Sequence, residues 1–147
     1  MFKHILVPTD GSTLSTEAAK KAVSFARETG AKIVFFYARP GYPVAFYGEG
    51  ALIDPITPEK FAEMAQKQTE EVLAAARTLA ADAGVTCTAV SSDSDAPYES
   101  IINAAIDNGC DLIFMASHGR RGLSGLLLGS ETQKVLTHSK IPVLVYR

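Results

Sequence analysis

The chain has 147 residues, a length typical of one domain with one hydrophobic core. Apolar residues make up 47% and charged residues 20%, and the net charge of −2 argues against a general nucleic-acid binder. No apolar run reaches the ~18 residues that span a bilayer, and the start of the chain has no signal-peptide cleavage site. Cys87 and Cys110 lack metal or redox spacing, which predicts buried thiols and a cytoplasmic protein.

Strand and helix signals alternate from the first residues onward. The apolar run His4–Val7 predicts a strand, and Ser12 or Thr13 can cap the helix that follows. Alanines recur on one face of that helix, and Gly30 is its expected C-terminal stop. Lys32–Ala38 is the second predicted strand.

The next stretch, Arg39–Ile56, has three prolines and three glycines and no helical or strand period. A loop of that length is usually functional or mobile, although a loose surface loop is an equal alternative. Thr57 and Pro58 then open the longest predicted helix, which ends at Gly84. Its expected inward face comprises Phe61, Met64, Val72, Leu73, Ala76, Leu79 and Ala80.

The second half of the chain is predicted to hold strands over Val85–Val90, Asp111–Ala116 and Pro142–Tyr146. Between them, one helix runs from Pro97 to Gly109 with Ile101, Ile102, Ala105 and Ile106 inward, and another begins at Ser130. This alternation predicts an α/β fold: a doubly wound, five-stranded parallel sheet covered on both faces, as one domain over residues 1–147.

In open parallel sheets, ligands bind at the carboxyl ends of the strands, where the strand order reverses. The first strand is followed there by Pro8, Thr9 and Asp10, and the fourth by the small-residue segment Ser117–Thr132. Right-handed crossovers favour placing both segments in one crevice. Asp10 is then a candidate partner for ribose hydroxyls or a divalent ion.

The segment after the fourth strand has the chemistry of an anion site. Gly119 and Gly129 lack Cβ atoms, so their backbone N–H groups can approach phosphate oxygens closely. Ser130 stands at a predicted helix N-terminus, which favours an anion, and Arg120 and Arg121 can neutralise phosphate charge.

A purely structural interpretation of the same residues also stands. Ser130 with Gln133 has the spacing of a capping box, and Gly119 with Gly122 can shape a turn. Glycine-rich spacing alone leaves both interpretations open.

The combination of motifs resembles the universal stress protein family, and the resemblance covers essentially the whole chain. It rests on Ile5–Ser12, on Ser117-His118-Gly119, and on Pro142–Val145. It also rests on Gly119 and the pair Gly129-Ser130, with nine residues between the two glycines. The resemblance implies a Rossmann-like sheet of order 3-2-1-4-5 and homodimers paired through the last strand. One branch of the family binds ATP through Gly-x2-Gly-x9-Gly-Ser/Thr.

This chain has Ala116 where that pattern has its first glycine, and a negative φ there would make the added methyl benign. The resemblance therefore places it in the ATP-binding branch, with Mg²⁺ or Mn²⁺ held beside the phosphates by Asp10. The implied contacts are Pro8, Thr9, Asp10, Ala38, Met115, Ala116, Ser117, His118, Gly119, Arg120, Arg121, Gly129, Ser130, Glu131 and Thr132.

The sequence predicts little turnover. There is no nucleophile elbow and no Walker lysine to assist phosphoryl transfer, so the chain is at most a slow ATPase. The expected function is a cytoplasmic ATP-binding stress or signalling protein. The alternative is a nucleotide-free interaction module that holds another small ligand or a partner protein. The apolar strand Pro142–Tyr146, at a sheet edge, invites pairing in a symmetric homodimer.

Overall fold

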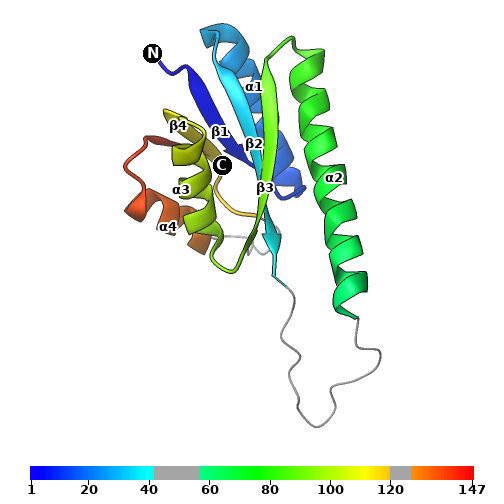
Figure 1. The fold of residues 1–147 in the computed structure, drawn as a ribbon. Helices are drawn as coiled ribbons and strands as arrows, with labels where there is room; N and C mark the ends of the chain where they lie inside the picture. Colours follow the sequence, from blue (N-terminus) through cyan, green and yellow to red (C-terminus); the bar gives the residue numbers. More distant parts are fainter. Residues whose placement is uncertain (42–56, 120–126) are drawn as a thin grey trace.

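The computed structural model describes residues 1–41, 57–119 and 127–147. Arg120, Arg121 and residues 42–56 therefore lie outside the described residues. The elements in chain order are β1 (His4–Pro8), α1 (Thr13–Thr29), β2 (Lys32–Pro40), α2 (Pro58–Asp82), β3 (Cys87–Ser94), α3 (Pro97–Asp107), β4 (Leu112–Ala116), α4 (Ser130–His138) and β5 (Val143–Tyr146). The strands form one parallel sheet of order β3-β2-β1-β4-β5, which confirms the predicted architecture (Figure 1).

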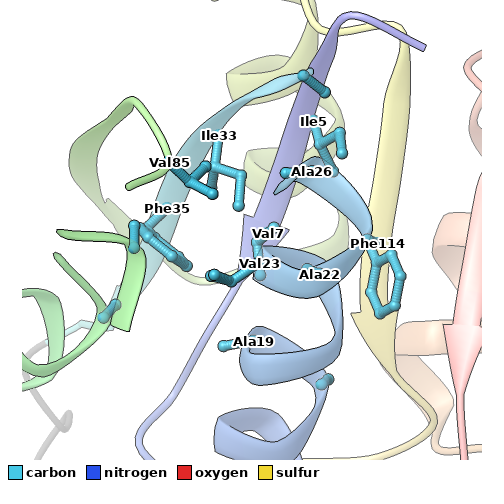
Figure 2. Packing of buried hydrophobic residues seen from close by; sticks show 14 of the residues in the cluster. Ile5, Val7, Ala19, Ala22, Val23, Ala26, Ile33, Phe35, Val85 and Phe114 are labelled. Carbon is cyan, nitrogen blue, oxygen red and sulfur yellow. The ribbon is translucent and has the colours of Figure 1, made fainter. Parts of the chain in front are cut away.

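Two apolar layers hold the helices on the two faces of this sheet. Because successive strand residues point to opposite faces, Ile5 and Val7 pack against α1 and α2, whereas Leu6 packs toward α3 and α4. Figure 2 shows the first layer, in which the alanines of α1 allow the helix to lie close to β1, β2 and β4.

Local signals set the helix ends where the sequence predicts them. The Ser12 hydroxyl caps α1 by accepting from the Ser15 N–H at 3.2 Å. The Thr57 hydroxyl caps α2 by accepting from the Lys60 N–H at 3.2 Å. Gly30 ends α1 with φ 75°, a left-handed conformation that other residues adopt at a cost.

The strands extend further than the apolar runs suggest. β2 continues through Pro40, so the first residues of the predicted Arg39–Ile56 loop belong to the sheet. β3 lies at Cys87–Ser94 and not at the predicted Val85–Val90, because it pairs with β2 over its whole length. It is an edge strand, and its last residues are polar, so hydrophobicity did not reveal them.

Two residues predicted to face inward are exposed, and those predictions are wrong. Met64 is 54% exposed because it lies off the face of α2 that the residues Thr69, Val72, Leu73, Ala76 and Ala80 bury. The helix runs beside β3 (Figure 1). Ile106 is 60% exposed because α3 buries a narrow face centred on Ile101, Ala104 and Ala105.

Both cysteines are free thiols, but the prediction that both are buried is wrong for Cys87. Cys110 is buried, and burial raises its pKa to about 11. Cys87 is only half-buried, and burial raises its pKa as well. Within the described ranges, no helix has both the length and the apolarity to cross a membrane.

Candidate functional site

The strand order reverses between β1 and β4, which lie side by side with Ile5 opposite Leu112. The segments that follow these strands therefore leave the same edge of the sheet, as predicted. They also touch: a Cβ atom added at Gly119 would overlap Oδ2 of Asp10. The Gly119 backbone thus lies directly against the Asp10 carboxylate, and a larger residue there would require that carboxylate to shift.

Hydrogen bonds to β2 and to the start of α1 hold the segment after β1 in place. The Thr9 N–H donates to the Phe36 carbonyl at 2.9 Å, and the Thr9 hydroxyl lies 3.3 Å from the Ser15 hydroxyl. Oδ1 of Asp10 accepts from the Ser12 N–H at 2.9 Å. These contacts fix the Asp10 carboxylate at the end of β1, on the side that meets the β4 segment.

The end of β4 is joined to both β5 and α4. The Ser117 N–H donates to the Tyr146 carbonyl at 2.7 Å, and the Ser117 carbonyl accepts from the Gly129 N–H at 2.7 Å. The buried Thr132 hydroxyl donates to the Ala116 carbonyl at 3.1 Å. The first turn of α4 is therefore bound to the last residues of β4.

Gly129 approaches the β4 segment so closely that a side chain there would require its neighbours to shift. An added Cβ would lie 3.1 Å from Cβ and 3.2 Å from Cα of His118, and 3.3 Å from the Ser117 carbonyl oxygen. Its φ of −72° is ordinary, so space and not backbone conformation selects glycine. Sequence reasoning assigned this glycine to phosphate approach and did not foresee the contact with residues 117–118.

The N-terminus of α4 has no side-chain cap in the part of the chain that the structure describes. Its N-cap is Gly129, and Ser130 is an exposed first helical residue. The predicted capping box of Ser130 and Gln133 is wrong, because Gly129 and not Ser130 is the N-cap, and the Gln133 side chain donates to the Leu128 carbonyl at 3.2 Å. First-turn N–H groups without a capping side chain, at the positive end of the helix dipole, favour an anion.

The side chains of Glu131 and Thr132 are turned away from that end. Thr132 is bonded to β4, and Oε2 of Glu131 accepts from the Tyr98 N–H in α3 at 2.8 Å. These two predicted site residues therefore offer a ligand their backbone N–H groups only. Tyr98 was not predicted, and no local pattern links it to a residue 33 positions away.

The remaining predicted site residues are Met115, Ala38, Pro8 and His118, and they differ in burial. Met115 is a buried core residue of β4, and Ala38 is half-buried in β2, on the face that α3 and α4 cover. Pro8 is the half-buried last residue of β1. His118 is half-buried, with Nδ1 3.2 Å from the Ser117 hydroxyl. The carboxyl ends of β1 and β4 thus bring together residues 8–10, 116–119 and 129–132. Met115 packs in the core beneath them.

Two cavities lie next to α2, on the face of the sheet that α1 and α2 cover. One of about 230 Å³ lies between α1 and α2 and touches the crevice through Thr9 and Gly11. The other, of about 510 Å³, lies at the ends of β2 and β3 beside Arg39 and Asp93. Neither is lined by described residues of β4 or α4, so cavity volume does not locate the β1–β4 crevice.

Comparison with known proteins gives a consistent family. The model of the universal stress protein family matches residues 1–147. Universal stress protein MJ0531 of Methanocaldococcus jannaschii is 32% identical over 148 residues, covering 100% of this chain and 83% of that protein.

Solved structures agree in fold. MJ0577 of the same archaeon superposes with a TM-score of 0.76 at 29% identity, covering 99% of this chain and 95% of that one. A universal stress protein in complex with cAMP has a TM-score of 0.68 at 26% identity, with 99% and 97% covered. Family members with bound dAMP, from Archaeoglobus fulgidus, and with bound AMP, from Arabidopsis thaliana, are 16% and 18% identical and show the fold alone.

Proposed function

The chain belongs to the universal stress protein family, and we propose that it binds ATP in the crevice between β1 and β4 and acts in a stress or signalling response. The observation that carries this proposal is the N-terminus of α4, which no side chain of the described residues caps and which faces the segment after β4. Its charge preference matches a phosphate. A universal stress protein that is 26% identical to this chain was solved in complex with cAMP, which supports an adenine nucleotide as the ligand.

Different residues contact the phosphates, the ribose and the adenine of the nucleotide. Backbone N–H groups of 130–132 and the Ser130 hydroxyl hold phosphate oxygens, and Asp10 accepts from the ribose hydroxyls or helps to hold a divalent ion. Ala38, small and half-buried on the α3 and α4 face, lies beside the adenine. Because no lysine stands in a phosphate-binding motif, hydrolysis is slow or absent.

A divalent ion fits this site only together with the nucleotide. Within the described residues, no three histidine, cysteine, aspartate or glutamate side chains gather into a metal site. Mg²⁺, which prefers oxygen ligands and retains water, is therefore held by the phosphates with Asp10 as its protein carboxylate. Bound there, the ion would neutralise phosphate charge beside that carboxylate.

Calorimetric titration tests the proposal directly. ATP with Mg²⁺ is expected to bind with micromolar affinity or better, and adenosine more weakly, because adenosine makes no contact with α4. The absence of binding at millimolar ATP would overturn the proposal and favour a nucleotide-free interaction module. Mass spectrometry of the purified protein offers an independent check through any co-purified nucleotide.

The position of Ala116 predicts that its methyl group does not obstruct ATP. Ala116 is the last residue of β4, is 8% exposed, and its side chain belongs to the core layer under α1. Ala116→Gly is therefore expected to leave ATP affinity within about twofold of the original. It should lower the free energy of unfolding by about 1 kcal/mol, because a strand residue becomes more flexible.

Titration and chemical unfolding measure the two effects. Ala89→Gly in β3 is the matched control, since it makes the same change in a strand away from the crevice. A tenfold gain in ATP affinity for Ala116→Gly alone would contradict the prediction and identify the methyl group as an obstruction.

We also propose a symmetric homodimer paired through β5. This strand is at the sheet edge, and all four of its residues are half-buried in the single chain. The Pro142 and Tyr146 carbonyls accept from β4, so the alternate residues Val143 and Val145 turn their N–H groups to the open edge. A second copy can add its own strand there.

Val145→Pro removes one outward N–H and leaves the β4 pairing intact. It is expected to raise the dimer dissociation constant at least about tenfold, since the symmetric interface loses two hydrogen bonds. Sedimentation velocity over a concentration series measures this. A clean monomer for the unmodified chain at tens of micromolar would refute the dimer.

A further inference from the structure

Helix α3 begins without a cap of its own. Its N-cap is Ala96, whose side chain cannot accept a hydrogen bond, and Pro97 is its first residue. The first-turn N–H groups of a helix need acceptors from elsewhere. The Tyr98 N–H donates to Oε2 of Glu131 at 2.8 Å, so a carboxylate from another helix serves as the cap.

Glu131 stands in the first turn of α4, where a carboxylate normally interacts with the N–H groups of its own helix. Here both oxygens are engaged elsewhere. Oε2 accepts from α3, and Oε1 lies 3.2 Å from Nζ of Lys134. The carboxylate is thus paired with the Tyr98 N–H and the Lys134 ammonium, and not with the N–H groups of its own first turn.

Tyr98 extends the connection along α4. Its ring centre lies 5.3 Å from the His138 ring centre and 5.5 Å from Nζ of Lys134. The start of α3 therefore contacts both the first turn and the last residue of α4. The two helices also lie side by side on one face of the sheet (Figure 1).

Two further hydrogen bonds hold the start of α4 in place. The Thr132 hydroxyl is bonded to the Ala116 carbonyl, and the Gly129 N–H to the Ser117 carbonyl. The first turn is thus joined to β4 on one side and, through Glu131, to α3 on the other. Glu131 is the member of this set that links the turn to a second helix.

We propose that Glu131 is a positioning residue for nucleotide binding. It ties the first turn of α4 to α3, and it keeps its own charge engaged so that the backbone N–H groups remain available to phosphate. This inference rests on the proposed function and deepens it.

Two substitutions separate the hydrogen bond from the charge. Glu131→Gln keeps an oxygen that can accept from the Tyr98 N–H, so ATP affinity should stay within about threefold. Glu131→Ala removes the acceptor and should weaken ATP binding about tenfold, a loss typical of one hydrogen bond to a charged group. Adenosine affinity should not change, because adenosine makes no contact with α4.

The link itself is measured without any ligand. Hydrogen exchange of the Tyr98 amide in the free protein should be about tenfold faster or more in Glu131→Ala than in the unmodified chain. In Glu131→Gln the exchange rate should equal that of the unmodified chain. Glu99→Ala is the matched control, because Glu99 accepts from the Tyr98 hydroxyl and not from its N–H. It should alter neither the exchange rate nor ATP affinity.

Three outcomes would overturn the inference. Unchanged Tyr98 exchange in Glu131→Ala would show that there is no link. Unchanged ATP affinity beside faster exchange would show that the link does not position the phosphates, and equal losses for ATP and adenosine would indicate general destabilisation. Failure of the unmodified chain to bind ATP would overturn the proposed function instead, and the Tyr98 exchange rate tells the two failures apart.

Discussion

Gly129→Val is expected to lower ATP affinity at least about 30-fold, or ~2 kcal/mol, the largest binding effect that the crevice offers. The first added carbon already lies 3.1 to 3.3 Å from His118 and the Ser117 carbonyl oxygen. The two further carbons of valine must push residues 117–118 away from α4. That movement strains the 2.7 Å hydrogen bond between Gly129 and Ser117 and displaces the N–H groups assigned to phosphate.

Titration with ATP measures the effect, and Gly129→Ala should give a smaller loss, because its single carbon requires a shift of a few tenths of an ångström. Thermal unfolding of each variant checks that the fold persists, since overpacking costs about 1–3 kcal/mol. A folded Gly129→Val protein with unchanged ATP affinity would show that phosphate does not bind at this end of α4.

Ile113→Ala is expected to lower the free energy of unfolding by about 2–5 kcal/mol. Ile113 lies in β4 between β1 and β5 and is fully buried in the layer under α3 and α4. Deleting its side chain loses apolar burial and leaves a cavity that the central strands cannot readily close. The loss is a large part of the ~5–15 kcal/mol that stabilises a typical domain.

Denaturant unfolding followed by circular dichroism measures this change. Ile106→Ala is the matched control, because the same side chain is 60% exposed on α3. It should cost less than about 0.5 kcal/mol, in keeping with surface substitutions. Similar losses for the two variants would contradict the assignment of the core.

The central strands could be predicted because the buried residues of β1 (Ile5–Val7) and all of β4 form continuous apolar runs, as expected for strands covered on both faces. The helix caps Ser12 and Thr57 could be predicted because capping is a local interaction. The polar half of β3 could not, since an edge strand needs no continuous apolar run.

The site shows the same division between local and distant causes. The meeting of Asp10 with the segment after β4 followed from general rules for parallel sheets and their crossovers. The capping box was wrong because the N-cap is Gly129, so that Ser130 is already the first helical residue and its hydroxyl makes no cap. The pairing of Glu131 with Tyr98 depends on how two helices pack, which spacing along one helix does not encode.

The two edges of the sheet differ in a way that governs how many copies can associate. The edge strand β3 carries an exposed Asp93 carboxylate, paired with Arg39 at 2.9 Å, and its last four residues are all polar. The opposite edge, β5, is apolar. Charged edges discourage strand addition, so growth from β3 is disfavoured. In the proposed homodimer, association through β5 would therefore be complete after two copies and would not continue into a fibre.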